Sequence, residues 1–365
     1  MPTEDERFMA LAIQMAERGL GTTAPNPSVG AVLVKPDAEG AIVLARASTA
    51  PGGRPHAETQ AIAQAGAAAR GATLYVTLEP CAHHGKTPPC ADAVIAAGIA
   101  RVVVGTGDPD PRTAGQGIAR LRAAGITVVE DILQAEARQV TLGHILRQTA
   151  KRPFVQLKMA LDAAGKIARG AQGQPIWVTG PEARAAGRLL RAEADAILVG
   201  AGTVRDDDPE LTCRLPGMTG RTPLRLVLDA QLTMPPKARL LKDTARHPVT
   251  IFFCETAPSA RAEALRKAGA RLVAVPKSTG HLDLRSVLAF LASEGITRLL
   301  VEGGPTVWRS VLEAGLADEI VVFRQGSAPL QAGLTAAYGA RADFALVSDQ
   351  GIGSDRMGVF RSRPG

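Results

Sequence analysis

One histidine and two cysteines stand in contexts typical of a catalytic zinc site. His56 follows a Gly/Pro-rich loop and opens a helical stretch, Cys81 follows an apolar run, and Cys90 comes nine residues later. One imidazole and two thiolates leave the fourth tetrahedral position of a zinc ion open, whereas a structural site fills all four positions with protein ligands. The spacing therefore predicts one catalytic zinc ion per chain.

Glu58 stands two residues after His56. At that spacing its carboxylate can reach a water in the open position but cannot serve as a fourth ligand. The metal lowers the pKa of such a water, and Glu58 can carry its proton to a leaving amine. His-x-Glu followed by Pro-Cys is typical of zinc deaminases, although those acting on nucleobases have their second Cys three residues after the first. The pattern indicates a hydrolytic deaminase.

Composition narrows the class of protein. The chain has 365 residues and a net charge of +7, divided into −1 over residues 1–150 and +8 over residues 151–365. Its basic residues are scattered and aromatics make up only 3%, which argues against nucleic-acid binding and favours small phosphorylated anions. We find neither an apolar run long enough for a membrane span nor a secretory signal, and four cysteines are too few for a disulfide framework. A soluble cytoplasmic protein is expected.

Apolar runs alternate with helical stretches along the whole chain, which predicts α/β layers. Before residue 150 the runs lie at 29–34, 42–45, 74–78, 102–105 and 126–129, and the helical stretches at 4–19, 57–69, 89–97, 114–124 and 133–148. Thr3 and Glu6 form a predicted capping box for the first helix. After a break at residues 151–153 the runs lie at 154–159, 196–200, 224–228, 250–253, 272–275, 299–301 and 320–323, with helical stretches at 182–193, 259–268, 283–293 and 306–314. We expect two domains, 1–150 and 151–365.

Residues 79–90 (EPCAHHGKTPPC) resemble the family of bifunctional riboflavin-biosynthesis deaminase/reductases. Further matches are PNPSVG at 25–30, PHAE at 55–58, DPDP at 108–111, QLK at 156–158, WVT at 177–179, GTV at 202–204, DDPELT at 207–212 and VEGGPT at 301–306. The resemblance covers residues 6–325 and implies a cytidine-deaminase-like three-layer domain followed by a dihydrofolate-reductase-like domain. The implied reactions are hydrolytic deamination of 2,5-diamino-6-(5-phosphoribosylamino)pyrimidin-4(3H)-one and NADPH-dependent reduction of its ribosyl group, giving 5-amino-6-(5-phosphoribitylamino)uracil.

The resemblance also implies roles for individual residues. It makes His56, Cys81 and Cys90 the zinc ligands and Glu58 the catalytic proton shuttle. The substrate-binding positions are Asn26, His83 and Lys86 in the first domain and Pro175, Arg191, Leu211, Arg214 and Glu302 in the second. The NADPH-binding positions are Ala160, Trp177, Thr203, Asp207, Gly303, Gly304, Pro305 and Thr306. A Gly-Gly turn between a strand and a helix is suited to holding a phosphate on backbone N–H groups.

Several positions depart from the family pattern or carry no motif. Thr49 stands where the family often has a histidine, Asp110 replaces the asparagine of Asp-Pro-Asn-Pro, and the alignment is blurred over residues 160–165. Cys213 and Cys254 are expected to be buried thiols. His144, His247 and His281 are interpreted as surface or packing residues.

Three alternatives stay open at this point. A deaminase of nucleosides or tRNA bases would have the shorter cysteine spacing and aromatic or basic features around its pocket. A binding module with structural zinc would need a fourth ligand, for which His83 or His84 is the nearby candidate. A monofunctional deaminase of a related pyrimidine would carry an inactive reductase-like domain. The resemblance further suggests a homodimer or homotetramer, acting on a small phosphorylated pyrimidine, with no nucleic-acid or membrane partner.

Overall fold

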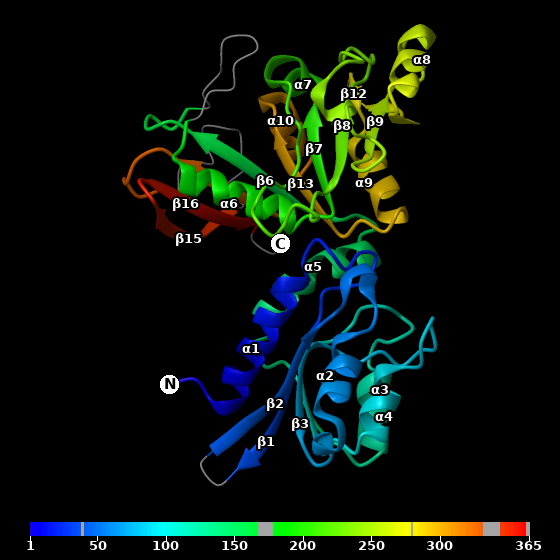
Figure 1. Cartoon of the computed structure of the whole chain (residues 1–365), viewed down its shortest axis with the longest axis vertical. Coiled ribbons are helices and arrows are strands. Elements are labelled where there is room, and N and C mark those ends of the chain that lie inside the picture. Colours follow the sequence, from blue (N-terminus) through cyan, green and yellow to red (C-terminus); the bar gives the residue numbers. More distant parts are fainter. Residues whose placement is uncertain (38–39, 167–177, 279, 331–343, 363–365) are drawn as a thin grey trace. The chain divides into compact units, whose positions relative to one another are not determined.

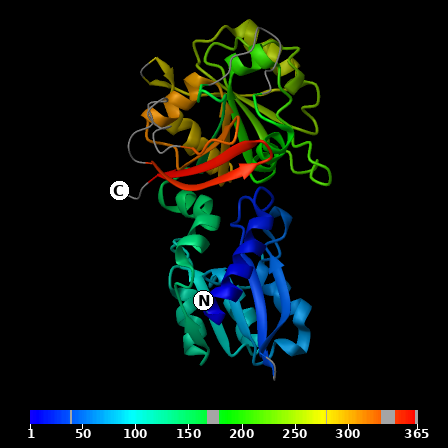
Figure 2. The ribbon, with the colours of Figure 1, turned by 90° about the vertical axis from the view of Figure 1, so that its left-hand side faces the viewer.

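The computed structural model describes residues 1–37, 40–166, 178–278, 280–330 and 344–362. The chain divides into two compact units, Met1–Arg152 and Pro153–Gly365. The division falls just after residue 150, the boundary expected from the sequence. In both units helices cover a central sheet (Figures 1 and 2).

The first unit is a three-layer α/β structure around a five-stranded sheet of order β2-β1-β3-β4-β5. β1 pairs antiparallel with β2 and β3, and β3, β4 and β5 run parallel. The strands are β1 (Gly30–Asp37), β2 (Gly40–Ser48), β3 (Thr73–Leu78), β4 (Arg101–Thr106) and β5 (Thr127–Val129). The helices are α1 (Glu4–Gly19), α2 (Ala57–Ala65), α3 (Cys90–Ala96), α4 (Gln116–Ala123) and α5 (Gln134–Thr149), with 3₁₀ turns at Pro51–Gly53 and Gly66–Ala69.

Alternating strand residues of this sheet pack into two separate cores. Leu74 and Val76 of β3 face α2, α3 and α4, whereas Tyr75 faces α1 and α5. Because successive side chains of a strand point to opposite faces, the helices must cover both sides of the sheet. This arrangement confirms the predicted α/β layers.

The first helix begins as predicted. The Thr3 hydroxyl accepts a hydrogen bond from the Glu6 N–H at 3.2 Å, and the Thr3 N–H donates to the Glu6 carboxylate at 2.7 Å. Its approach to the sheet depends on Gly30, where a Cβ would lie 1.8 Å from the carbonyl oxygen of Ala12. Only glycine lets α1 pack this closely onto β1.

The second unit contains a nine-stranded sheet of order β10-β9-β8-β7-β13-β6-β14-β16-β15, parallel from β10 to β14 and antiparallel beyond. Its strands are β6 (Phe154–Leu161), β7 (Ala196–Gly200), β8 (Leu224–Leu228), β9 (Val249–Phe253), β10 (Arg271–Ala274), β13 (Arg298–Gly303), β14 (Glu319–Arg324), β15 (Phe344–Ile352) and β16 (Asp355–Ser362). A separate short pair is formed by β11 (Lys277–Ser278) and β12 (His281–Leu282).

Helices cover both faces of this sheet as well. They are α6 (Pro181–Ala192), α7 (Ala201–Asp207), α8 (Ser259–Lys267), α9 (Leu284–Ser293) and α10 (Pro305–Glu313), with a 3₁₀ turn at Arg239–Leu241. Leu299 and Val301 of β13 pack with α9 and α10, and the intervening Leu300 packs with α7 and α8. The seven predicted strands are all present, whereas α7, the β11–β12 pair and the β15–β16 hairpin were not predicted.

Among the described residues, no helix combines the length and apolar character that crossing a bilayer requires.

Candidate functional site

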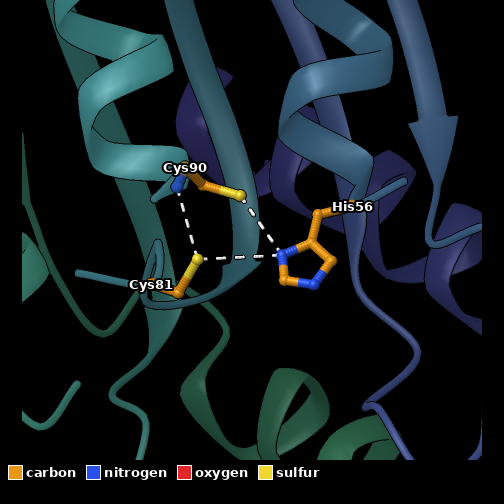
Figure 3. A group of neighbouring side chains, drawn as sticks. All are labelled: His56, Cys81 and Cys90. Carbon is orange, nitrogen blue, oxygen red and sulfur yellow. Dashed lines mark hydrogen bonds between the residues drawn. The ribbon is translucent and has the colours of Figure 1, made fainter. Parts of the chain in front are cut away.

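The three predicted zinc ligands meet at one point of the first unit (Figure 3). His56 precedes α2, Cys81 lies in the loop after β3, and Cys90 is the first residue of α3. The His56 Nδ1 atom lies 3.2 Å from Cys90 Sγ and 3.7 Å from Cys81 Sγ, and the Cys90 N–H donates to Cys81 Sγ at 3.3 Å. Across the residues that the structure describes, no fourth His, Cys, Asp or Glu joins the group, as expected for a catalytic site.

Glu58 lies beside these ligands and is 3% exposed. Its Oε2 atom is buried without a hydrogen-bond partner, and burial raises the pKa of its carboxyl group above the usual value. An orphaned carboxylate oxygen costs free energy unless a further polar group is present. The donor set and this orphaned oxygen both fit a zinc site with a polar group in its open position.

Of the two cysteines, Cys81 is the one whose surroundings favour the metal-binding form. Hydrogen bonding from Cys90, together with that from His56, lowers the pKa of Cys81 to about 4 against the opposing effect of burial. Cys90 has a raised pKa because it donates to Cys81 and is buried. Cys81 therefore favours the thiolate, the form in which cysteine binds metals.

Glu79 holds the neighbouring loop in place, a role that the sequence did not reveal. Its Oε1 accepts hydrogen bonds from the N–H groups of Gly117 at 2.9 Å and Ile118 at 3.2 Å, and its Oε2 accepts one from Gly115 at 3.0 Å. A Cβ at position 117 would lie 2.0 Å from the Pro80 carbonyl oxygen, so only glycine fits against the loop that carries Cys81. These contacts fix the start of α4 against the zinc ligands.

A cavity of about 440 Å³ adjoins the zinc ligands, which is within the usual range for small-molecule sites. It brings together the predicted Asn26, Glu58, His83 and Lys86. The Asn26 amide donates to the Gly53 carbonyl at 2.8 Å. Further lining residues without a predicted role include Arg54, Asp108, Asp110, Arg112, His144 and Arg147.

His144 is buried, as a packing residue would be, but it also lines this cavity. Its Nε2 lies 3.0 Å from Asp108 Oδ1, so α5 supports the DPDP segment. The burial of His144 and its contact with Asp108 agree with its interpretation as a packing residue, and its place in the cavity lining is an addition. No local motif surrounds it, and the Asp108 contact exists only in the folded chain.

Thr49 and Asp110, which depart from the family pattern, both line this cavity and make contacts within the chain. Thr49 is 3% exposed, and its hydroxyl accepts a hydrogen bond from the Val29 N–H at 3.0 Å. Arg54, from the same loop, reaches the cavity and donates to Thr87. Asp110 pairs with Arg112 at 2.5 Å, which lowers the pKa of Asp110 to about 2.

The second unit has a cavity of about 80 Å³ that contains the predicted Arg191, Arg214 and Glu302. Arg191 forms a two-pronged ion pair with Glu302, Nε to Oε1 at 2.5 Å and Nη2 to Oε2 at 2.8 Å. Leu211 is 2% exposed and packs in a hydrophobic cluster, and the structure does not bring its side chain to this cavity. Pro175 lies outside the described residues.

Most of the predicted NADPH-binding positions lie near the carboxyl ends of three neighbouring strands. Ala160 is in β6, Thr203 follows β7 in α7, and Gly303 ends β13. Gly304 precedes α10, which Pro305 and Thr306 begin, as the sequence predicted. A Cβ on Gly304 would lie 3.2 Å from the Thr203 hydroxyl, so these two loops are in contact. Ligands of parallel α/β sheets bind at such strand ends.

Two further positions, Asp207 and Trp177, were also predicted to bind NADPH. Asp207 is the last residue of α7, and burial, with Asp206 beside it, raises the pKa of its carboxyl group. Trp177 lies outside the described residues. Cys213 and Cys254 are buried, as predicted.

The pH dependence of stability should reveal the charge of Glu302. Burial acts to raise its pKa, but Arg191 and Lys158 hold it at about 2, below the ordinary 4.5. A depressed carboxyl pKa contributes stability that is present above the ordinary value and lost as the pH falls from 4.5 toward 2. We expect Glu302→Gln to flatten the pH dependence of the unfolding free energy in this window.

Both tryptophans, Trp177 and Trp308, belong to the second unit, so urea unfolding followed by tryptophan fluorescence reports on it. Glu313→Gln, at an exposed position of α10, is the matched control. Equal pH profiles for the two variants would contradict the assigned ionisation of Glu302.

The fold and the site define a class of protein: a zinc-dependent deaminase unit followed by a second α/β unit. Residues 2–106 match the family model described as cytidine and deoxycytidylate deaminase zinc-binding region, and residues 153–331 match the RibD C-terminal domain.

Whole-chain comparisons identify the particular family. The riboflavin biosynthesis protein RibD of Escherichia coli (strain K12) is 41% identical over 331 residues, covering 88% of this chain and 87% of that protein. The RibD protein of Aquifex aeolicus is 42% identical over 320 residues, covering 87% and 86%. The chain belongs to the RibD family of riboflavin biosynthesis proteins.

Solved structures agree over the full length. Acinetobacter baumannii RibD matches with a TM-score of 0.82 and 32% identity over 99% of both chains. A diaminohydroxyphosphoribosylaminopyrimidine deaminase/5-amino-6-(5-phosphoribosylamino)uracil reductase from Thermotoga maritima matches with a TM-score of 0.81 and 36% identity over 98% of both. The likeness thus includes both units of the present chain.

Proposed function

We propose that this chain catalyses two consecutive steps of riboflavin biosynthesis. The first is hydrolytic deamination of 2,5-diamino-6-(5-phosphoribosylamino)pyrimidin-4(3H)-one, and the second is NADPH-dependent reduction of the ribosyl group to ribityl. The observation that carries the proposal is the convergence of His56, Cys81, Cys90 and the unpaired Oε2 atom of Glu58 beside a cavity of about 440 Å³. We assign deamination to residues 1–150 and reduction to residues 151–365.

In the deaminase unit, His56, Cys81 and Cys90 would hold zinc, which would supply the Lewis acidity that makes water nucleophilic near neutral pH. Glu58 accepts the proton of the attacking water and delivers it to the departing amine, which leaves as ammonia while oxygen takes its place on the pyrimidine. Its burial excludes competing solvent protons from the carboxylate. Asn26 orients the pyrimidine.

Basic side chains of the same cavity suit the phosphate of this substrate. His83 and Lys86, in the loop between the cysteines, line the cavity with Arg54. A lysine on a flexible stem binds a phosphate as a point charge, and arginine adds paired donors. We assign the substrate phosphate to this cationic side of the deaminase cavity.

In the reductase unit, NADPH supplies the hydride. The loops at Thr203 and Gly303–Thr306 would hold the cofactor, and the backbone N–H groups at the N-terminus of α10 would bind one of its phosphates. The Arg191–Glu302 pair lies in the substrate cavity and positions the sugar. This chain contributes binding and orientation to the reduction.

We also propose the setting in which the protein works. The cysteine ligands must stay reduced, which favours the cytoplasm. We further propose a homodimer or homotetramer formed through the second unit, on the ground of the family resemblance.

Removal of zinc tests whether deamination and reduction take place in separate units. Chelation of the bound zinc should abolish ammonia release, leave NADPH oxidation with the deaminated intermediate unchanged, and be reversed by added zinc. Ammonia release at the original rate from protein shown by elemental analysis to hold no metal would refute the proposal.

A further inference from the structure

A buried histidine lines the deaminase cavity and has no part in the reaction proposed above. His144, in α5, is 7% exposed and shares the cavity wall with Asp108, which follows β4. The Nε2 atom of His144 lies 3.0 Å from Oδ1 of Asp108, whose side chain is only 9% exposed. The imidazole ring therefore meets a carboxylate at the wall of the site rather than solvent.

The surroundings of the ring decide which of its nitrogen atoms carries a proton. An ionised carboxylate only accepts hydrogen bonds, so Nε2 of His144 must be the donor to Asp108. The Nδ1 atom is buried, and among the described residues it has no hydrogen-bond partner. A proton on Nδ1 would thus be a buried donor without an acceptor, which costs free energy. His144 acts as a donor to Asp108 through Nε2.

The carboxylate of Asp108 is held through one of its two oxygens. Oδ1 accepts the hydrogen bond from His144 and a second one from the N–H of Asp110 at 2.9 Å. Across the described part of the chain, no hydrogen bond ends on Oδ2. Two donors from different segments therefore fix the orientation of the carboxylate and leave Oδ2 as an acceptor.

Other carboxylates of the cavity wall are already engaged. Asp110 pairs with Arg112 at 2.5 Å, and Glu79 accepts backbone N–H groups at the start of α4. The proposed diaminopyrimidine carries N–H donors on its ring and on its amino groups. A hydrogen bond to an ionised acceptor is stronger than one between neutral groups. Asp108 is thus suited to accept a donor of the substrate.

We propose that His144 is a positioning residue of the deaminase unit, whose Nε2–H group holds Asp108 so that Oδ2 accepts an N–H group of the pyrimidine. This inference rests on the proposed function, because the N–H donor belongs to the diaminopyrimidine. His144 itself touches Asp108 and not the substrate. Its contribution is the orientation of the ring before the attack of water.

The test compares His144→Phe and His144→Gln with His281→Phe in the full zinc-loaded chain. Phenylalanine keeps a ring but removes the donor, whereas glutamine offers an N–H donor again. His281 is exposed in β12 and is the matched control. For His144→Phe we expect kcat/KM for deamination to fall about tenfold to a hundredfold, as for the loss of one hydrogen bond to a charged group. His144→Gln should recover most of this loss, with zinc content and NADPH oxidation unchanged in all three variants.

A double-mutant cycle with Asp108→Ala separates positioning from packing. Once the carboxylate is absent, His144→Phe should reduce kcat/KM little further, because the two residues act as one unit. Nitrogen NMR of the histidine-labelled native chain gives a readout besides activity. The signal of His144, identified by its absence from His144→Gln, should show a proton on Nε2.

Three results would overturn the inference while deamination by the native chain stands. They are equal kcat/KM values for His144→Phe and His281→Phe, additive losses in the double-mutant cycle, and a ring of His144 protonated on Nδ1 alone. A native, zinc-loaded chain that releases no ammonia from the diaminopyrimidine would instead overturn the proposed function, and with it the ligand named for Asp108.

Discussion

Glu58→Gln should stop ammonia release while zinc stays bound. The glutamine keeps the size of the side chain but cannot accept and return a proton, and general acid–base catalysis contributes about 10²- to 10⁴-fold. We expect deamination to fall by about 10³-fold within that range. Zinc content should not change, because only His56, Cys81 and Cys90 form the ligand group among the described residues.

The measurement pairs ammonia release with elemental analysis of the purified variant. Glu17→Gln, on the exposed side of α1, removes an equal charge and should behave as the native chain. NADPH oxidation with the deaminated intermediate should be normal in both variants. Undiminished deamination by Glu58→Gln would exclude the proton-shuttle role.

Arg191→Ala should damage the second unit alone. Removing one partner of a buried ion pair typically costs about 3–5 kcal/mol, because the other charge is left without compensation. The Glu302 side chain is 8% exposed, and Lys158 at 4.0 Å replaces little of the lost pair. We expect a lower free energy of unfolding and a reduced kcat/KM for reduction, with deamination unchanged.

A second variant separates stability from function. Arg191→Ala combined with Glu302→Ala removes the uncompensated carboxylate, so the double variant should recover much of the unfolding free energy without recovering reduction. Urea unfolding and steady-state reduction at several substrate concentrations measure the two effects. A parallel loss of deamination would contradict the division into two independent sites.

The zinc site was readable from the sequence because each ligand belongs to a local motif. His56 opens a helix, Cys81 follows a strand, and Cys90 opens the next helix, so three short-range patterns converge in one topology. The capping box of Thr3 and Glu6 was readable for the same reason.

The residues whose roles were not predicted act through contacts with segments that are distant in the sequence. His144 reaches Asp108 across 36 positions, and Glu79 reaches Gly117 across 38. The helical spacing of Arg184, Arg188 and Arg191 is visible in the sequence, but only the fold shows that Glu302 engages one of them.

The missed elements have a related physical cause. The β15–β16 hairpin lies at the edge of its sheet, where half-buried residues replace a continuous apolar run. The short α7 has little periodic signal over its seven residues. Periodicity identifies elements with a well-buried face and misses those without one.

A paired assay shows whether this one chain carries two consecutive activities. Zinc-loaded protein receives the diaminopyrimidine ribosyl phosphate, ammonia is measured, and NADPH is then added. We expect ammonia release without NADPH, followed by NADPH oxidation in equal amount. Ammonia release without NADPH oxidation would instead indicate a monofunctional deaminase with an inactive reductase-like domain. The absence of both ammonia release and NADPH oxidation would contradict the proposed substrate.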